Sequence, residues 1–197
     1  MTAIIISVVL ILVVVGLDQI SKYAIVATFG VGDHISKGAE VMDRIAAGLD
    51  SIDIIPGVFR LSFTVNDGAA FGSMDEHRWI FMVLSTIAII GILVFLFWKK
   101  PQDKLLLSSL ILITGGGIGN MIDRVALGYV IDFIDFCAFP NLWMWIFNIA
   151  DSCVCIGAGL LALWLILDMI RETKAEKAKK LADAEQSTKS EADGSDE

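Results

Sequence analysis

The chain has 197 residues, of which 56% are hydrophobic, with a mean hydropathy of +0.73 and a formal net charge of −8. A water-soluble domain of this length is far less apolar, so the composition predicts a membrane protein. The negative charge, and the lack of a basic stripe away from the apolar segments, argue against nucleic-acid binding.

Apolar segments long enough to cross a bilayer, which takes roughly 20 helical residues, lie at about 3–27, 79–98, 105–122 and 146–170. We do not expect the first to be a cleaved signal peptide. It lacks a basic start and an A-x-A cleavage site, and it continues through Asp18 and Lys22. The second carries no charge and ends in Trp79 and Trp98, whose rings favour the membrane interface. The sequence therefore predicts four membrane spans.

Basic residues gather beside the ends of these spans. They fill the connection between the second and third spans and follow the fourth, as Lys99, Lys100, Lys104, Arg171, Lys174, Lys177, Lys179 and Lys180. By the positive-inside rule both places are cytoplasmic, which puts the N-terminus inside and leaves 29–78 and about 123–147 on the outer face. We interpret 1–172 as one four-span domain and 173–197 as a cytoplasmic charged tail, a frayed helix that gives way to disorder.

Ionisable side chains inside the spans are costly in lipid, so each one is a candidate functional residue. Asp18 and Lys22 stand four apart, on one helical face and in the favourable order of acid before base. Their position favours a structural ion pair over a catalytic role, and such a pair can also brace a neighbouring site.

The third span ends in "GGGIGNMIDR", whose glycines at 115, 116, 117 and 119 permit close approach of a helix or a ligand. Asn120 and Arg124 stand four apart, so an amide and a guanidinium project from one face and can bind peptide carbonyls or a lipid headgroup. We interpret Asp123 as a local charge partner of Arg124 rather than a reactive acid, because adjacent helical residues point in different directions.

The stretch "GYVIDFIDF" (128–136) is rich in branched and aromatic residues and predicts a short strand at the membrane surface. In a strand, Asp132 and Asp135 face opposite ways, and the alternation does not decide which of them faces a cleft. The fourth span opens with "FNIADSC", where Asn148 and Asp151 are neighbours on a helix surface. Asp151 is only about 8 Å inside its span, so it can face a cavity.

If Asp132 meets Asp151, two carboxylates share a pocket of low dielectric constant and keep one proton between them, as in an aspartic protease. The competing interpretation is a small proton-coupled transporter that uses the same acids. We expect no metal or other cofactor, because no metal-binding spacing joins the cysteines and histidines, Cys137, Cys153, Cys155, His34 and His77.

Four motifs carry a resemblance to a known family. In chain order they are "DQISK" (18–22), "NDGAAFG" (66–72), "GGGIGNMIDRVALGYVIDF" (115–133) and "FNIADS" (147–152). Together they resemble bacterial lipoprotein signal peptidase, signal peptidase II, over about residues 4–170. The resemblance implies a multi-pass aspartic peptidase of the bacterial inner membrane whose active site is at the outer, periplasmic face.

The implied reaction removes the signal peptide from diacylglyceryl-modified prolipoproteins by cutting just before the lipid-bearing cysteine. The expected partners are that lipid-modified signal peptide and membrane lipids, and we expect a monomer. The family's catalytic aspartates fall on Asp132 and Asp151, which selects Asp132 over Asp135 and Asp123.

The resemblance also implies supporting residues and a fold. The residues that would bind substrate are Asn66, Gly68, Asn120, Arg124 and Asn148, and those that would support the structure are Asp18 and Lys22, with Asp123 beside Arg124. The implied fold is an all-α four-helix transmembrane bundle with a small outer-face β-sheet, the cradle, and a short surface helix. The strands are expected in 58–72 and 128–136.

Two stretches depart from the family pattern. Residues 32–51 look like an insertion, in which Val41, Ile45 and Leu49 recur every four residues as in an amphipathic surface helix. It either covers the site or is a tolerated addition to an outer loop. The second departure is Asp67 in "NDG", which adds a charge near the expected pocket.

Overall fold

The structure is a computed structural model and describes residues 2–30, 51–66, 78–139 and 145–193. The helix predicted within 32–51, apart from Ser51, and the predicted site residue Gly68 lie outside these ranges. The described helices are α1 (Thr2–Phe29), α3 (Arg78–Lys99), α4 (Lys104–Ala126) and α5 (Ile149–Asp193). The strands are β1 (Ser51–Ile55), β2 (Phe59–Asn66), β3 (Val130–Phe136) and β4 (Ile146–Phe147), in one antiparallel sheet of order β1-β2-β3-β4.

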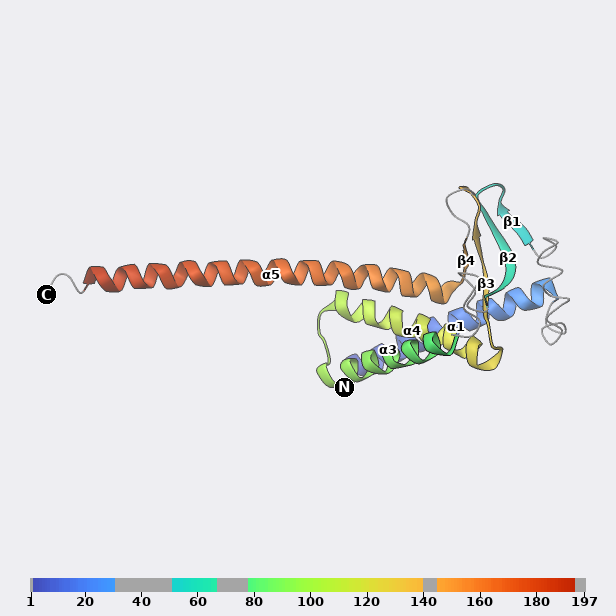
Figure 1. Cartoon of the computed structure of the whole chain (residues 1–197), viewed down its shortest axis with the longest axis horizontal. Helices are drawn as coiled ribbons and strands as arrows, with labels where there is room; N and C mark the ends of the chain where they lie inside the picture. Colours follow the sequence, from blue (N-terminus) through green and yellow to red (C-terminus); the bar gives the residue numbers. More distant parts are fainter. Residues whose placement is uncertain (1, 31–50, 67–77, 140–144, 194–197) are drawn as a thin grey trace.

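All four described helices are long and apolar enough to cross a membrane. Figure 1 shows the helices side by side with the sheet across one end of the bundle. The α3–α4 connection, the N-terminus and the long extension of α5 lie at the opposite end. The predicted class, a helical membrane bundle with a small sheet, is therefore confirmed for the described part of the chain.

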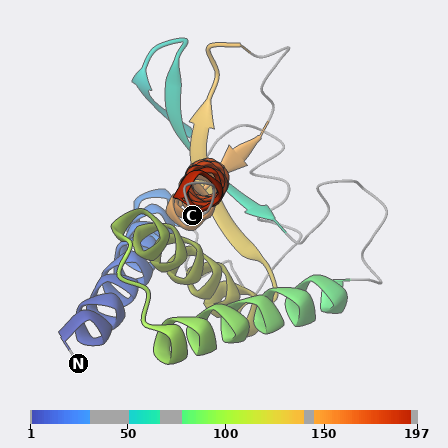
Figure 2. The ribbon, with the colours of Figure 1, turned by 90° about the vertical axis from the view of Figure 1, so that its left-hand side faces the viewer.

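Helix α4 is the centre of the bundle, and it packs against each of the other three helices (Figure 2). Its glycines allow this close packing. A Cβ atom at Gly116 would lie 2.3 Å from the carbonyl oxygen of Ala150, and one at Gly119 would lie 2.6 Å from Asp18 Oδ2. The glycine run thus serves helix packing, one of the two uses that its sequence allowed.

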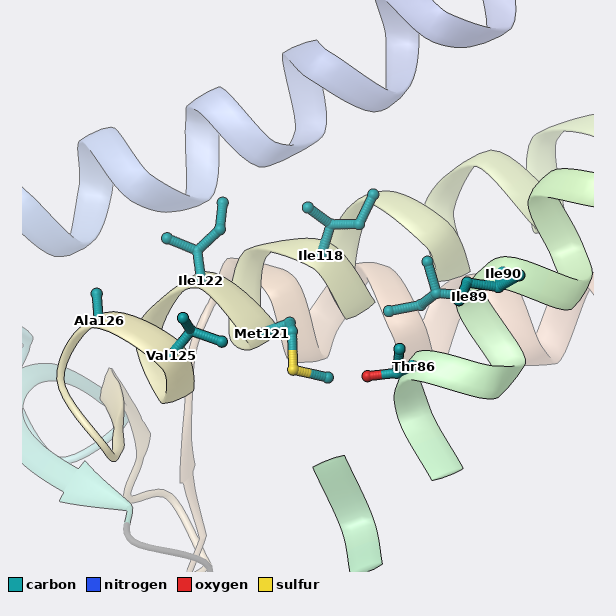
Figure 3. Close-up of a pocket in the computed structure, with 8 residues that line it drawn as sticks. All are labelled: Thr86, Ile89, Ile90, Ile118, Met121, Ile122, Val125 and Ala126. Atoms are coloured by element: carbon teal, nitrogen blue, oxygen red, sulfur yellow. The ribbon is translucent and has the colours of Figure 1, made fainter. Parts of the chain in front are cut away.

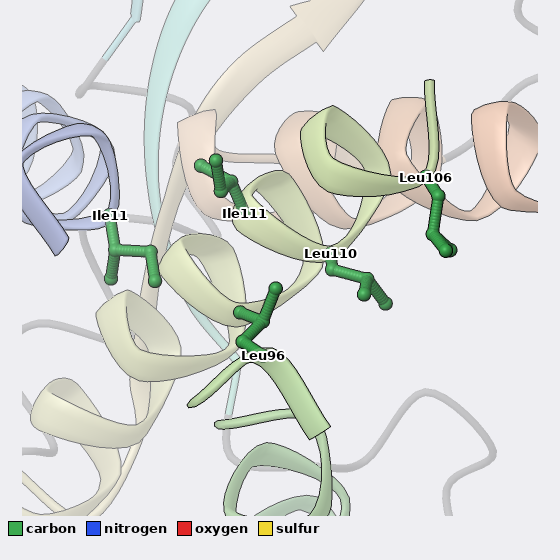
Figure 4. Packing of buried hydrophobic residues seen from close by; sticks show 5 residues of the cluster. All are labelled: Ile11, Leu96, Leu106, Leu110 and Ile111. Carbon is green, nitrogen blue, oxygen red and sulfur yellow. The ribbon is translucent and has the colours of Figure 1, made fainter. Parts of the chain in front are cut away.

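Two apolar clusters hold the fold. At the end away from the sheet, Ile11, Leu96, Leu106, Leu110 and Ile111 join α1, α3 and α4 (Figure 4). At the other end, Ile25 of α1 packs against three residues of the sheet, Phe63, Ile131 and Phe133. The second cluster fixes the sheet on the end of α1, and with it the strand that carries Asp132.

Local backbone features set both ends of α4. Asp103 caps the start of α4 by accepting hydrogen bonds from the N–H groups of Leu105 and Leu106. After its end, Gly128 has a φ of 84°, a left-handed conformation that glycine adopts without strain. The chain therefore turns at once into β3, which places Asp132 beside the end of α4.

Two predicted boundaries need correction. The fourth apolar segment was expected to be helical from 146, but Ile146 and Phe147 form β4 and the helix starts at Ile149, because Asn148 takes the N-cap position. The tail from 173 was expected to be a frayed helix that gives way to disorder, and in the structure the helix is the longer part, because α5 continues to Asp193. This part is rich in the strong helix formers alanine, lysine and glutamate. An ion pair of 2.7 Å between Glu176 and Lys180, one helical turn apart, adds support.

Candidate functional site

The two predicted catalytic acids lie where the sheet meets the helices. Asp132 is in the middle of β3 and is 1% exposed, and Asp151 is half-buried in the first turn of α5. The register of β2 and β3 gives the two acids of the strand different partners. Asp132 pairs with Thr64, while Asp135 pairs with Arg60 and forms an ion pair with its guanidinium. Asp135 is thus used within the sheet.

A single buried amide joins the two acids. Asn148 Nδ2 donates to Asp132 Oδ1 over 2.7 Å, and Asn148 Oδ1 accepts from the backbone N–H of Asp151 over 2.8 Å. The backbone N–H of Asn148 in turn donates to Asp151 Oδ2 over 3.3 Å. This reciprocal pair is a capping box, in which the N-cap residue and the residue three positions later satisfy each other's N–H groups. Asn148, at the start of α5, therefore positions Asp151 and also binds the side chain of Asp132.

Two further asparagines donate to the carboxylate oxygens of Asp132 and Asp151 that Asn148 does not bind. Asn66 Nδ2, from the end of β2, donates to Asp132 Oδ2 over 3.0 Å. Asn120 Nδ2, from α4, donates to Asp151 Oδ1 over 2.7 Å. Each carboxylate therefore receives an N–H donor on both of its oxygens, and the donors come from strand, helix and cap.

Burial and, to a smaller extent, the nearby charge of Asp151 raise the pKa of Asp132 to about 7. The amide donors of Asn66 and Asn148 and the ammonium of Lys22 act in the opposite direction but do not cancel the effect. A carboxyl with a pKa near 7 is protonated for much of the time at neutral pH. The geometry therefore allows one acid to donate a proton while the other accepts one.

Behind this pair lies a buried ion cluster. Lys22 Nζ is 2.8 Å from Asp18 Oδ2, 2.8 Å from Asp123 Oδ2 and 3.0 Å from Asn120 Oδ1. Asp18, Lys22 and Asp123 are 0%, 2% and 3% exposed. The expected pairing of Asp123 with Arg124 is therefore wrong, because Asp123 faces α1 and takes Lys22 as its partner. The pairing of Asp18 with Lys22 is as the spacing predicted.

The cluster is tied to the elements that carry the acids. Asp18 Oδ1 accepts from the backbone N–H of Ala150, in the first turn of α5, over 2.9 Å. Asp123 Oδ2 accepts from the backbone N–H of Ile131, the residue before Asp132, over 3.1 Å. These bonds connect α1 and α4 to the backbone on either side of the site.

Sequence reasoning missed Gln19. Its Nε2 lies 2.9 Å from Asp123 Oδ1, 3.2 Å from Asp18 Oδ2 and 3.1 Å from the carbonyl oxygen of Gly119. The signal was present, because a polar amide inside an apolar span needs a hydrogen-bond partner. Gln19 lets two carboxylates share one lysine by donating to both.

The remaining predicted residues have a plainer placement. Arg124 is half-buried on α4, and the described residues include no ion pair to it. Within the same ranges, no group of three His, Cys, Asp or Glu side chains could hold a metal ion. The site in the described part of the chain is therefore built from carboxylates, amides and one ammonium.

An apolar pocket of about 400 Å³ lies between α3 and α4 (Figure 3). Its lining includes Thr86 and Ile89 from α3 and Ile118, Met121 and Val125 from α4. None of its lining residues is ionisable. The pocket cannot perform acid–base chemistry, but it can hold an apolar chain.

Comparisons with known proteins give one answer. Residues 10–167 match the family model described as signal peptidase (SPase) II. The lipoprotein signal peptidase of Symbiobacterium thermophilum is 41% identical, over 82% of this chain and 94% of the relative. That of Halalkalibacterium halodurans is 35% identical, over 85% and 94%. A solved bacterial membrane enzyme, determined by the in meso method at 2.3 Å resolution, superposes with a TM-score of 0.66 and 31% identity, over 83% of this chain and 88% of that one.

Proposed function

Because this chain belongs to the signal peptidase II family, we propose that it is an aspartic endopeptidase that removes signal peptides from diacylglyceryl-modified prolipoproteins. It hydrolyses the peptide bond before the lipid-bearing cysteine, with Asp132 and Asp151 as the catalytic pair. The observation that carries the proposal is the buried amide of Asn148, which bonds to the side chain of one acid and the backbone of the other.

The reaction needs one proton on the pair. The ionised acid takes a proton from water as the water oxygen bonds to the scissile carbonyl carbon, and the protonated acid gives its proton to the carbonyl oxygen. The tetrahedral intermediate then collapses, the C–N bond breaks, and the leaving nitrogen takes up a proton from the pair. The raised pKa of Asp132 supports its role as the proton donor.

The position of the pair supports hydrolysis at the membrane surface. Water does not reach a peptide bond in the hydrocarbon layer, so the reacting groups have to lie where the spans end. Asp132 is on a strand and Asp151 is in the first turn of its helix. With the basic α3–α4 connection and both termini on the cytoplasmic side, this end of the bundle faces the periplasm in the bacterial inner membrane.

The substrate is an apolar helix that carries acyl chains. The apolar pocket between α3 and α4, two helices long and apolar enough to span a membrane, supports accommodation of such a chain. Arg124, half-buried one turn after Asn120, supplies a fork of N–H donors for a peptide carbonyl or a headgroup near the cleavage point. Asn66 and Asn148 align the acid that faces that bond.

The test is cleavage of a lipidated precursor peptide by purified protein. Asp132→Asn and Asp151→Asn are each expected to abolish cleavage. Asp135→Asn is the control and retains cleavage, because Asp135 lies on the same strand as Asp132 but pairs with Arg60. All three variants have to remain folded and inserted, as judged by circular dichroism. Cleavage at near the parent rate by either of the first two variants contradicts the proposal. Proton flux across liposomes that both substitutions remove, without any cleavage, would indicate a transporter instead.

A further inference from the structure

The ammonium group of Lys22 has no N–H donor left for a substrate. An ammonium group has three donors and no acceptor. All three donors of Lys22 are used, on Asp18 Oδ2 and Asp123 Oδ2 at 2.8 Å each and on Asn120 Oδ1 at 3.0 Å. With 2% of its surface exposed, Lys22 is also closed off from solvent. Apart from its positive charge, which lowers the pKa of Asp132, Lys22 can influence the reaction only through its three partners.

One of these partners contacts a catalytic acid. Asn120 Nδ2 donates to Asp151 Oδ1 over 2.7 Å, while its Oδ1 accepts from Lys22. If the amide were turned over, its NH₂ group would face the ammonium and its oxygen would face the carboxylate, so both contacts would be repulsive. Asn148 Nδ2 adds a second donor to the Asn120 oxygen at 3.0 Å. The amide of Asn120 is therefore locked in one orientation.

We propose that Lys22 is a positioning residue for peptide hydrolysis: by binding the oxygen of Asn120 it turns the amide nitrogen toward Asp151 and holds that carboxylate in place beside Asp132. The inference rests on the proposed function of the aspartate pair. It also changes the role expected for Asn120. At 7% exposure, with its oxygen bonded twice and its nitrogen on Asp151, Asn120 orients an acid rather than lining the substrate path.

The chain offers a matched control. Gln19 lies on the same helix as Lys22 and bonds to the same two carboxylates, Asp18 and Asp123, but it has no hydrogen bond to Asn120. Gln19→Leu therefore weakens the cluster without breaking the connection to Asp151. A general bracing role predicts that losses of kcat follow losses of stability at 19 and 22, and the positioning role predicts that Asn120→Ala lowers kcat as much as Lys22→Met does.

The experiment measures kcat and KM on a lipidated peptide for the full chain in nanodiscs. Asn120→Ala leaves the Lys22 ion pairs intact and is expected to lower kcat about 10- to 100-fold, the effect of losing one hydrogen bond to a charged group, with KM within about twofold. Lys22→Met gives a similar loss, and the double variant is no slower than the slower single variant. Gln19→Leu lowers the melting temperature and keeps kcat within about twofold of the parent.

Three results overturn the inference: parent-like kcat in Asn120→Ala, additive losses in the double variant, or an equal loss of kcat in Gln19→Leu. If Lys22→Met does not fold, Lys22→Met combined with Asp123→Asn removes one charge of each sign from the cluster. It is then compared with Asp123→Asn alone, and equal kcat in these two variants overturns the inference.

A readout without substrate separates this inference from the proposed function. The ¹⁵N side-chain amide signal of Asn120, assigned by its absence in Asn120→Ala, shifts in the variant that lacks Lys22 and stays in place in Gln19→Leu. An unshifted signal overturns the inference whether or not the protein cleaves peptides. If the signal shifts in the variant that lacks Lys22 but the parent protein cleaves no lipidated peptide, the amide lock is supported and the proposed function is overturned.

Discussion

Asn148 performs two separable tasks, and a pair of substitutions tells them apart. Its Oδ1 caps α5 at the backbone N–H of Asp151, and its Nδ2 donates to Asp132 Oδ1. Asn148→Ala removes both functions. Asn148→Ser keeps a good N-cap residue, but its shorter side chain carries no amide for Asp132. The two replacements differ in size by little, so the comparison isolates the cap.

The expected magnitudes follow from these bonds. Replacing a capping side chain by alanine costs about 0.5–2 kcal/mol, so Asn148→Ala is less stable than Asn148→Ser by about 1 kcal/mol. A hydrogen bond to a charged group is worth about 1.5–3 kcal/mol, so loss of the bond to Asp132 lowers the cleavage rate about 10- to 100-fold in both variants.

Thermal unfolding in detergent and cleavage of a lipidated peptide, measured on the same samples, check both numbers. Parent-like cleavage by Asn148→Ser would refute the role of the Nδ2 donor. Equal stability of the serine and alanine variants would refute the role of the cap.

Three further predictions follow from the geometry. The raised pKa of Asp132, about 7, means that the proton it supplies is present below that pH and lost above it, so kcat/KM falls as the pH rises through about 7; a profile that is flat across neutral pH contradicts this. Gly119→Ala places a Cβ atom 2.6 Å from Asp18 Oδ2 and lowers stability by about 1–3 kcal/mol in thermal unfolding, while Gly159→Ala, with no neighbour within 4 Å, does not lower it. Arg124→Ala raises KM for a lipidated peptide more than it lowers kcat, and Arg124→Lys restores little, because lysine lacks the planar fork; unchanged kinetics would count against a binding role.

Local sequence pattern predicted the parts of the fold that depend on near neighbours. The four apolar segments and the pairing of Asp18 with Lys22 follow from helical length and spacing alone. The capping box at Asn148 was also readable, because "NIAD" has a capping residue followed three positions later by an acid. Spacing on the helix surface alone does not mark where the helix begins, so it does not predict the strand at 146–147.

Contacts between distant segments were beyond this reasoning. Alternation along β3 indicates that its two acids face opposite ways, but not that Asp135 pairs with Arg60 and Asp132 with Thr64 on the neighbouring strand. From local sequence, the expected partner of Asp123 is its chain neighbour Arg124. Its real partner, Lys22, comes from another helix about a hundred residues earlier, and no local periodicity reports such a contact.

The ion pair between Asp18 and Lys22 has a consequence for biosynthesis. Because both residues belong to α1, their contact forms with that helix, before α4 and α5 have been made. The first span thus enters the bilayer with an acid and a base that neutralise each other, which lowers the cost of burying either one. Asp18 Oδ1 is then ready to receive the N–H of Ala150 when the last span arrives. Helix α1, which is translated before α5, thus carries an acceptor that α5 needs.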